Sequence, residues 1–450
     1  MKRRESSFGK AFLKPFCFAK AFTENTSWKK RFVEIAIVLC SVFLVTTLPG
    51  IAAGQNQETL GIYGNANEDD TIDMRDITYT ARIICWLEEP TDLADANNDG
   101  EIDVGDMTQI GLIILGREKK LTIIDSNDRI VTLDMPIERI ISLSTGGPAA
   151  PLCLLGVEDK LVGSNGMIAK SPEYADLHDL PSVGYPGPDY EAIVELEPDL
   201  VMACTWAYGG EYGDVNMLES LGIKTVMFDL GNPATLPGVM KILGVMMGKE
   251  ERAEEYIDFF HSTLSLVDEE VEELTPEEKK TVYYEFAVRS EAYYKTGGSG
   301  SKFHEKIQRA GGINIFADVP WSSFTADPEA VLEEDPDVVI IDAHATCSVY
   351  EMEDTIAMEQ FREEIIDNRP GWNNMTAVKN DDLYIFVHET FLTTHVPVGI
   401  CYLAKTLHPD AFSDLDPDAI KKEYLEKFFP DRDYLMDYQG SHVYPCKWCS

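Results

Sequence analysis

Two stretches of the chain place oxygen-bearing side chains at the spacing of a calcium-binding loop. Such a loop wraps carboxylate and amide oxygens around one Ca²⁺ from positions one, three, five, nine and twelve. In the second stretch Gly100 makes the sharp turn at position six, and Ile102 at position eight anchors the loop to the core. The predicted ligands are Asn65, Asn67, Asp69, Asp73 and Asp76 in loop one, and Asp95, Asn97, Asp99, Asp103 and Asp106 in loop two.

An apolar segment that predicts a helix follows each loop, at residues 77–87 and 107–115. An EF-hand would also need a helix before each loop, and residues 60–64 are too few to form one. A loop followed by a helix, repeated after thirty residues, resembles the type I dockerin pattern over about residues 60–117. The resemblance implies a small all-α module that folds around two Ca²⁺ ions and binds a cohesin-bearing surface protein.

Loop one departs from the dockerin pattern at two positions. Asp70 stands at position six, where the pattern has glycine, and Asn65 replaces the leading aspartate. Both changes weaken the calcium affinity expected of this loop. A second interpretation therefore stays open, in which calcium only staples a small domain that has little core of its own, whether or not a cohesin exists.

A different pattern begins near residue 121, where apolar runs typical of strands alternate with helical stretches. This alternation predicts an α/β domain with mainly parallel sheets. Residues 189–202 read DYEAIVELEPDLVM and residues 327–340 read DPEAVLEEDPDVVI, an offset of 138 residues. Each copy predicts a short helix, a Pro-Asp stop and a buried strand, so we expect two similar lobes. Between them, residues 249–274 lack Gly and Pro and predict one helix of roughly 39 Å, at 1.5 Å per residue.

Several segments of this domain, taken in order, resemble the iron-siderophore, haem and cobalamin binding proteins of ABC importers. They read ERIISLSTGGPAAPLCLLGVEDKLVG, GYPGPDYEAIVELEPDLVMA, and KTGGSGSKFHEKIQRAGGINIF followed by VPWSSFTADPEAVLEEDPDVVII. The resemblance covers about residues 121–435 and implies two Rossmann-like lobes joined by a single long helix, with the ligand in the cleft between them. The expected boundaries are 121–247 for lobe one, 249–274 for the helix, 279–435 for lobe two and 436–450 for a C-terminal tail.

The resemblance also implies a function. It describes a substrate-binding protein that captures an iron(III) chelate of the siderophore type and delivers it to a membrane permease with its ATPase. Receptors for cobalamin or haem share this scaffold and remain alternatives. Binding of a bare metal ion is less expected, because no close spacing of His, Asp, Glu or Tyr demands it and a preformed chelate brings ligands of its own.

The candidate ligand contacts follow from the position of the strands. In open α/β sheets, ligands lie beyond the carboxyl ends of the strands, so residues directly after each strand are candidates. Aromatic and cationic side chains suit a bulky, planar or anionic chelate, and Arg289 can form bidentate bonds to its oxygens. Packing is the alternative role for each aromatic residue. The candidates after the strands are Thr145, Gly146, Thr205, Trp206, Tyr208, Arg289, Tyr293, His344 and His388, and the resemblance adds Tyr185 and Trp321.

Two glutamates occupy equivalent positions at the starts of the repeated helices, Glu191 and Glu329. In the resembled family, the matching pair docks against arginines of the permease, one acid per lobe. The alternative is a local role, because an acidic side chain in the first turn of a helix stabilises the helix dipole by about 0.3 to 1 kcal/mol.

The N-terminal residues 1–54 are typical of an export signal. Basic residues accumulate up to Arg31, an apolar run covers 32–48, and small residues follow at 50–54, where a signal peptidase could cut. A retained membrane anchor is the alternative to cleavage near Ala53 or Gly54. This segment has nine Lys or Arg and three Glu, which gives it a net charge of +6. Because the whole chain has a formal net charge of −40, the residues after the segment carry −46. Nucleic acid and anionic membrane surfaces are therefore poor partners for this chain, because both would repel a strongly acidic surface.

The remaining patterns give little sign of catalysis. The seven cysteines after the signal are scattered singly except for Cys446 and Cys449, which predict a local disulfide or an untethered tail rather than a disulfide framework. A dockerin-bearing polysaccharide hydrolase is the rival interpretation, but no GxSxG, HExxH or phosphate-binding loop occurs in a suitable context. We therefore expect a binding protein and not an enzyme.

Overall fold

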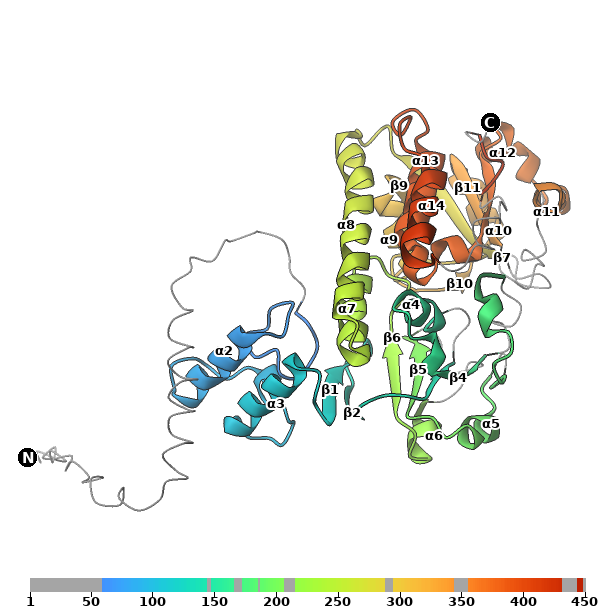
Figure 1. Ribbon diagram of the computed structural model, residues 1–450. Coiled ribbons are helices and arrows are strands. Elements are labelled where there is room, and N and C mark those ends of the chain that lie inside the picture. Colours follow the sequence, from blue (N-terminus) through green and yellow to red (C-terminus); the bar gives the residue numbers. More distant parts are fainter. Residues whose placement is uncertain are drawn as a thin grey trace, which may run out of the picture. The chain divides into compact units, whose positions relative to one another are not determined.

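The computed structural model describes residues 59–143, 147–165, 172–184, 187–205, 215–287, 294–343, 355–430 and 443–447 (Figure 1). The chain divides into two units, Met1–Asn56 and Gln57–Ser450, and the first unit, with the expected export signal, lies outside the described residues. Within the described ranges, every helix is too short or too polar to span a bilayer.

The region of the two predicted loops contains the helices α2 (Met74–Ile84) and α3 (Val104–Ile114), with a short 3-10 helix η1 (Asp92–Ala94) between them. Each helix starts three residues before the expected start, because the acid at loop position nine caps it. Asp73 accepts a hydrogen bond from the backbone N–H of Arg75 at 2.6 Å, and Asp103 accepts one from Gly105 at 2.5 Å. The acid at position twelve therefore lies inside the first turn of each helix. Below, "the module" means residues 59–117.

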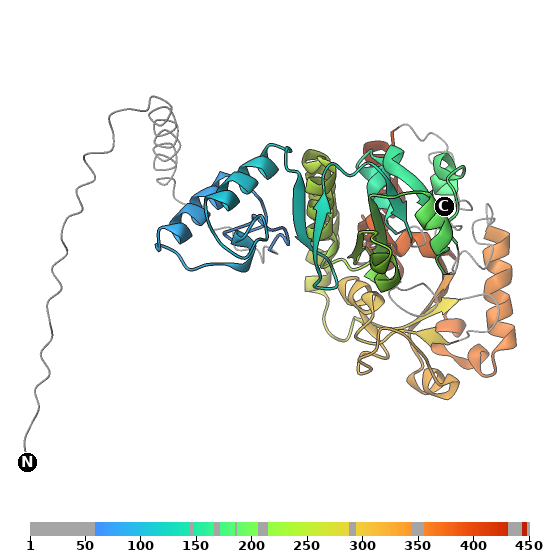
Figure 2. The same ribbon diagram turned by 90° about the horizontal axis from the view of Figure 1, so that it is seen from below.

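The module is joined to the following domain by backbone pairing and a shared core. Ile62 forms an antiparallel bridge with Ile123 of β1 (Lys120–Ile124), which pairs in an antiparallel hairpin with β2 (Ile130–Asp134). Leu60, Ile62 and Ile113 belong to the same apolar core as the α/β domain. Figures 1 and 2 both show the hairpin between the module helices and α7 (Leu236–Met247). The module is thus continuous with its neighbour and not a separate body on a linker.

Lobe one is built on a four-stranded parallel sheet with the order β4-β3-β5-β6. Parallel strands require crossover connections, and these carry helices that cover the faces of the sheet. The strands are β3 (Ile140–Ser142), β4 (Leu161–Ser164), β5 (Leu200–Cys204) and β6 (Thr225–Phe228). The helices are α4 (Ala149–Leu154), α5 (Tyr190–Glu195), α6 (Val215–Ser220) and α7, with the 3-10 helices η2 (Glu158–Lys160) and η4 (Pro172–Leu177).

Lobe two is built on a five-stranded sheet with the order β13-β12-β11-β7-β9, parallel except for β13. Its strands are β7 (Lys280–Ala287), β9 (Gly312–Asn314), β11 (Val338–Ala343), β12 (Leu383–Val387) and β13 (Val443–Tyr444), with a small pair formed by β8 (Lys295–Thr296) and β10 (Phe324–Thr325). Its helices are α9 (Lys302–Arg309), α10 (Pro328–Glu334), α11 (Thr355–Asn368), α12 (Thr376–Lys379), α13 (Val396–Leu407) and α14 (Pro417–Phe428), with the 3-10 helices η9 (Trp372–Asn374), η10 (His388–Phe391) and η11 (Thr393–His395).

The C-terminal segment departs from the sequence-based expectation of a tail after residue 435. Val443 and Tyr444 pair with Phe386 and Ile385 and add an antiparallel strand to the edge of the lobe-two sheet. Cys446, two residues later, is disulfide-bonded, and Cys449 lies outside the described residues. The sequence did not predict this strand, because two adjacent apolar residues are too short a pattern to indicate one.

One helix, α8 (Glu250–Glu273), connects the two lobes, as the absence of Gly and Pro predicted. Its buried face carries aromatic side chains that pack against α14: the Tyr256 and Phe259 rings each lie edge-on to the Phe428 ring, at 5.7 and 5.6 Å. The Tyr256 hydroxyl also donates a hydrogen bond to the backbone oxygen of Thr394, at 3.1 Å. The helix is therefore fastened to lobe two along its length, and it contacts α7 of lobe one as well.

Candidate functional site

The repeated sequence forms the same arrangement in both lobes. Helix α5 leads into β5, and α10 leads into β11, so each copy delivers a central parallel strand whose carboxyl end lies at the expected ligand edge. Of the predicted ligand contacts, Thr205, Trp321 and His388 fall within the described residues. The others lie outside them: Thr145, Gly146, Tyr185, Trp206, Tyr208, Arg289, Tyr293 and His344.

The three described candidates differ in their surroundings. Thr205 directly follows β5 and is half-buried, as expected for a residue at the edge of the sheet. Trp321 is 64% exposed, and its ring lies edge-on to Phe324 at 6.4 Å. His388 directly follows β12, and only 12% of its side chain is exposed. His388 is therefore the described candidate that the fold holds most firmly.

A buried carboxylate holds the His388 ring. Nδ1 of His388 lies 2.8 Å from each carboxylate oxygen of Asp342, which is the fifth residue of β11 and is fully buried. The Tyr284 hydroxyl, from the neighbouring strand β7, donates a second hydrogen bond to the same carboxylate. The sequence-based candidates did not include Asp342 or Tyr284. Asp342 had a signal nonetheless, since it is the only charged residue in the apolar run VVIIDA of a buried strand.

Two lysines of α9 lie near Asp342. The ammonium group of Lys306 is fully buried, donates a hydrogen bond to the backbone oxygen of Phe391 at 2.6 Å, and lies 4.6 Å from the centre of the Phe303 ring. Lys302 reaches towards lobe one, where a Cβ atom added to Gly231 would lie 2.5 Å from its Nζ. Burial lowers the pKa of Lys302 and lowers that of Lys306 well below its usual value, whereas Asp342 and Asp229 act in the opposite direction.

A second buried ion pair braces the other side of β7. Arg369 donates hydrogen bonds to both carboxylate oxygens of Glu285, at 2.5 and 2.8 Å, with both side chains almost fully buried. The Arg369 guanidinium also lies over the rings of Trp372 and Tyr294, at 4.3 and 4.8 Å. Tyr294 directly follows the candidate Tyr293. The Arg369–Glu285 ion pair therefore holds the chain in place next to this candidate, at the point where the described residues resume.

The two glutamates predicted to meet the permease are both exposed, in the first turns of α5 and α10. Neither is needed as a helix cap, because the preceding aspartates cap these helices. Asp189 accepts a hydrogen bond from Ala192 N–H at 3.1 Å, and Asp327 accepts one from Glu329 N–H at 3.0 Å. The local role left for the glutamates is their interaction with the helix dipole.

Loop one has oxygen ligands suited to calcium, but a cationic side chain of the protein already contacts two of them. The Asn65 amide nitrogen donates hydrogen bonds to the backbone oxygens of Leu60 and Asp69, while its buried Oδ1 has no hydrogen-bond partner among the described residues. Burial raises the pKa of Asp76 to about 6, and Asp69 and Asp73 add to the shift. An orphaned oxygen beside desolvated carboxylates fits a hard cation such as Ca²⁺. However, Arg75 already contacts Asp69 at 3.0 Å and Asp73 at 2.9 Å.

The departure at position six of loop one has a structural role. The Asp70 carboxylate forms an ion pair with Lys241 of α7, and each side chain is 18% exposed. Asp70 therefore ties loop one to lobe one at the place where a standard loop has glycine. The sequence could not predict this partner, which lies 171 residues further along the chain.

Loop two keeps the standard turn and has a glycine, Gly105, where loop one has Arg75. Asp95 accepts hydrogen bonds from the backbone N–H groups of Asp99 and Gly100, at 3.0 and 2.8 Å. Burial raises the pKa of Asp106, which is fully buried, and Asp95 and Asp99 act in the same direction. Throughout the described ranges, no ion pair joins a cationic side chain to the four aspartates of this loop.

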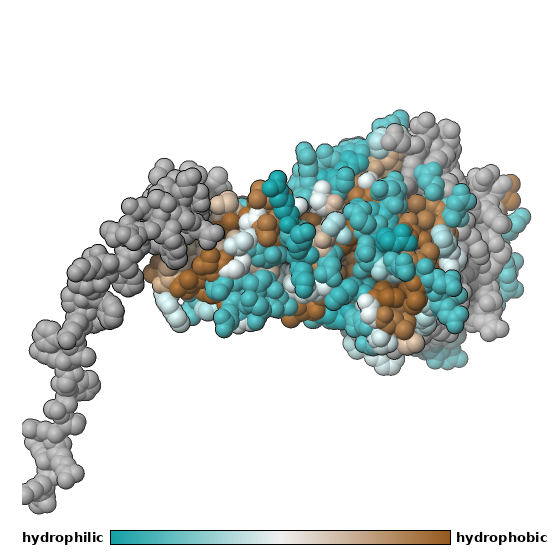
Figure 3. Space-filling view, turned by 60° about the horizontal axis from the view of Figure 1, so that its bottom comes forward, coloured by the Kyte–Doolittle hydropathy of each residue, from teal (hydrophilic) through white to brown (hydrophobic). Residues whose placement is uncertain are grey.

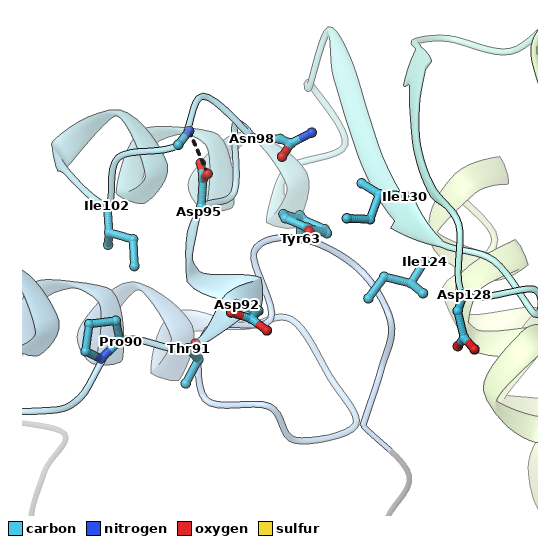
Figure 4. A pocket seen from close by; sticks show the side chains of 11 residues that line it. Tyr63, Pro90, Thr91, Asp92, Asp95, Asn98, Ile102, Ile124, Asp128 and Ile130 are labelled. Carbon is cyan, nitrogen blue, oxygen red and sulfur yellow. Dashed lines mark hydrogen bonds between the residues drawn. The ribbon is translucent and has the colours of Figure 1, made fainter.

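A pocket of about 600 Å³ opens beside loop two (Figure 4). Its apolar wall combines Tyr63 with Ile124 and Ile130 of the β1–β2 hairpin, and Asp95 and Asn98 of loop two face the same space. The described part of the chain nevertheless holds no group of three or more His, Cys, Asp or Glu side chains arranged to hold a metal ion. Neither loop presents a closed carboxylate cage, so calcium binding stays a prediction that rests on Asn65 and the buried acids.

The module also exposes large apolar side chains. Trp86, directly after the C-cap of α2, is 93% exposed, Leu87 is 68% exposed, and Met74 at the start of α2 is 53% exposed. Val104 and Leu115 extend this character to both ends of α3. Figure 3 shows hydrophobic residues at the surface of this part of the chain. An exposed tryptophan among such side chains is typical of a protein-binding surface.

Comparison of the sequence with protein-family models and with known proteins shows which family the α/β domain matches. The family model described as "Periplasmic binding protein" matches residues 140–388. An uncharacterized ABC transporter substrate-binding lipoprotein, YvrC of Bacillus subtilis, is 23% identical over 295 residues, which cover 64% of this chain and 86% of that protein. A vitamin B12-binding protein of Salmonella paratyphi A is 32% identical over 157 residues, 34% of this chain, and the match spans only 55% of that protein.

The fold has solved counterparts. The crystal structure of the TroA-like periplasmic binding protein FepB from Veillonella parvula superimposes with a TM-score of 0.57 at 25% identity, covering 69% of this chain and 96% of that one. The family match at residues 140–388 lies within the α/β domain and does not include the module.

Proposed function

The chain belongs to the periplasmic binding protein family, and on that premise we propose that it is the extracytoplasmic substrate-binding component of an ABC importer for an iron(III) chelate. One observation supports the importer role: the family match runs from β3, the first strand of the lobe-one sheet, to His388, directly after β12, and so includes the linking helix and every strand of the two sheets except β13. Proteins of this family bind solutes without converting them, which agrees with the expectation of a non-enzyme.

The chemistry at the sheet edge supports a preformed chelate as the ligand. Across the described residues, one histidine directly follows a strand of lobe two, two lysines lie near its carboxylate partner, and no cluster able to hold a bare ion occurs. A large anionic or metal-bearing organic ligand suits such a set better than a free cation. Cobalamin is the second candidate, because the relative named for vitamin B12 shares 32% identity over 157 residues.

Delivery requires a permease and its ATPase, and the two exposed glutamates support a docking role. Glu191 and Glu329 stand at equivalent positions of the repeated unit, in the first turns of α5 and α10. Two acids placed by one repeated unit match a permease that presents two equivalent basic sites.

The module is proposed to bind calcium and, through its exposed surface, a cohesin-bearing surface protein. Loop one is the weaker site in this proposal, because Arg75 neutralises two of its carboxylates and Asp70 is engaged by Lys241. The exposed Met74, Trp86 and Leu87 support a protein partner. In this proposal residues 1–54 act as an export signal or a retained membrane anchor, in keeping with the extracytoplasmic location of the family.

The ligand is tested with the purified full-length chain. Thermal shift and calorimetric titration with a ferric siderophore, haemin and cobalamin should show that one of them binds with micromolar or better affinity, near −8 kcal/mol, and is recovered unchanged. Incubation with polysaccharides and esters provides the enzymatic comparison. The proposal fails if none of the three chelates binds, or if a polysaccharide or ester is turned over.

The docking role is tested by Glu191→Ala combined with Glu329→Ala. Chelate uptake by cells should fall at least tenfold while chelate affinity and melting temperature stay unchanged, since exposed acids contribute only about 0 to 1 kcal/mol to folding. The matched control is Glu195→Ala with Glu333→Ala, which removes exposed acids one turn further along the same two helices. Equal loss of uptake in both double variants would show a general charge effect instead.

Calcium binding is tested by Arg75→Gly, which gives loop one the residue that loop two has. In a background with Asp99→Asn to weaken loop two, calcium affinity should rise about three- to tenfold, because two exposed ion pairs of up to about 1 kcal/mol each no longer compete for the carboxylates. Arg82→Ala is the control, since Arg82 pairs with Glu88 instead of a loop residue. An unchanged or weaker affinity contradicts the proposed competition, and no calcium binding at all contradicts the site.

The protein partner is tested by Trp86→Ala. Binding of the calcium-loaded chain to a purified type I cohesin, followed by interferometry, should weaken at least about thirtyfold, since a buried interface tryptophan commonly contributes about 2 kcal/mol or more. Leu266→Ala on α8, also an exposed apolar residue, should have no effect. Absence of binding by the unmodified chain would remove the cohesin from the proposal and leave calcium with a purely structural role.

A further inference from the structure

A pocket that the proposed function does not use opens between the module and the β1–β2 hairpin (Figure 4). Its volume of about 600 Å³ lies in the range of small-molecule sites, about 300 to 1,000 Å³. Backbone hydrogen bonds hold its walls: the Tyr63 N–H donates to the Thr122 oxygen of β1 at 2.9 Å, and the Gly64 N–H donates to the Leu93 oxygen of η1 at 2.7 Å. The pocket therefore belongs to the folded junction between the module and the α/β domain.

The side chain of Tyr63 brings an unused hydroxyl group to this pocket. Figure 4 shows the Tyr63 ring between loop two and the β1–β2 hairpin, and the residue is only 7% exposed. Its hydroxyl makes no hydrogen bond to any of the described residues. Burial raises the pKa of this hydroxyl, and the nearby Asp92 and Asp95 raise it further, so the group stays neutral and can accept a hydrogen bond. Because buried tyrosine hydroxyls usually have a partner, this one indicates a polar group of a ligand.

Three carboxylates surround the same space without a cation of the protein. Asp95 of loop two accepts backbone hydrogen bonds within its loop, at 3.0 and 2.8 Å. Asp92 of η1 and Asp128 of the hairpin turn also line the pocket. Their carboxylates have no side-chain hydrogen bond or ion pair within the described residues, and Arg129 pairs with Asp125 at 2.6 Å instead. Like charges around one space disfavour each other, so a cationic ligand would be stabilised there.

The rest of the lining indicates that this cation is organic. Ile124 and Ile130 of the hairpin form an apolar wall, and Ile130 is 56% exposed. A bare metal ion has no use for such a wall, and the described part of the chain holds no acidic group arranged around a metal. An ammonium or guanidinium group on an apolar stem uses every part of the lining, since both groups are hydrogen-bond donors only.

We propose that this pocket is a second binding site, for an organic cation with an apolar stem. The charged head interacts with Asp92 and Asp128 and donates a hydrogen bond to the Tyr63 hydroxyl, while the stem packs against Ile124 and Ile130. Because the lining comes from both the module and the hairpin, a bound cation also joins the module to the α/β domain. The site is separate from the chelate site and goes beyond the proposed function.

Matched probes test the site by calorimetric titration of the full-length chain at one fixed calcium concentration. Two sources of the same chemistry are compared: a free amine, benzylamine, and a basic peptide, acetyl-Leu-Arg-Leu-amide. Their neutral counterparts are benzyl alcohol and the same peptide with citrulline in place of arginine. The cationic member of each pair should bind at least tenfold tighter than its neutral counterpart. A peptide at least tenfold tighter than benzylamine assigns the pocket to a partner polypeptide, whereas similar affinities assign it to small amines.

Variants assign the binding to this pocket. Asp92→Asn combined with Asp128→Asn should weaken both cations at least tenfold and leave the neutral probes unchanged. Tyr63→Phe keeps the ring packing and the melting temperature, and should weaken the cations about three- to tenfold because one hydrogen bond is lost. The matched control is Glu89→Gln with Asp134→Asn, which removes two exposed acids of the module and the hairpin that do not line the pocket.

Several results would overturn the inference. These are equal binding of charged and neutral probes, an equal effect of the control double variant, and no binding of either cation at about 10 mM. If the Asp92 and Asp128 double variant melts early, Ile130→Ala replaces it. Removing apolar contact at this exposed position should weaken both members of each pair about threefold, and unchanged binding would equally reject the site. Chelate binding is unaffected by any of these outcomes, so the importer proposal is tested separately.

Discussion

Parallel strand pairing is the constraint on which the rest of this structure depends. Within each sheet the parallel strands, which are all strands except β13, run in the same direction, so the segments that follow them gather at one edge of that sheet. The lobe-one edge receives Thr205 after β5, and the lobe-two edge receives His388 after β12. Asp342 lies one residue before the end of β11, between β7 and β12, where it meets the Tyr284 hydroxyl and the His388 ring. The site is thus a consequence of strand order and not of any local motif.

The linking helix keeps this edge in place. Helix α8 shares one continuous apolar core with both lobes, and its aromatic face packs against α14 while its first half contacts α7. Phe259, which packs against Tyr424 and Phe428 of α14, contributes about 1.5 to 3 kcal/mol by burial and so holds the helix on lobe two. A receptor built in this way holds its ligand groups ready before the ligand arrives, which reduces the ordering cost of binding. The His388 ring, which Asp342 already holds in place, is one example of a side chain that is ordered before the ligand binds.

Local patterns predicted the parts of the fold that depend on local chemistry. The duplicated helix and strand and the long helix appear where the sequence predicted them, because periodicity and Pro-Asp stops are local signals. The contacts that define the site are not local: Asp342 lies 46 residues from His388, and Asp70 lies 171 residues from Lys241. The starts of α2 and α3 were missed by three residues, since an aspartate was assigned to metal binding when it also caps the helix.

The distribution of the basic residues carries more information than the large number of acidic ones. With 78 acids against 38 Lys and Arg, most carboxylates face solvent and need no partner. A buried cationic side chain does need a partner, because the loss of solvating water disfavours its charged form. Arg369 serves the buried Glu285, and Lys241 serves Asp70, so each has a carboxylate of its own. Near Asp342, however, Lys302 and Lys306 accompany a carboxylate that already accepts hydrogen bonds from Tyr284 and His388. Burial lowers the pKa of both lysines, and Asp229 acts on both of them as Asp342 does, so these buried cations lie among carboxylates like the other two.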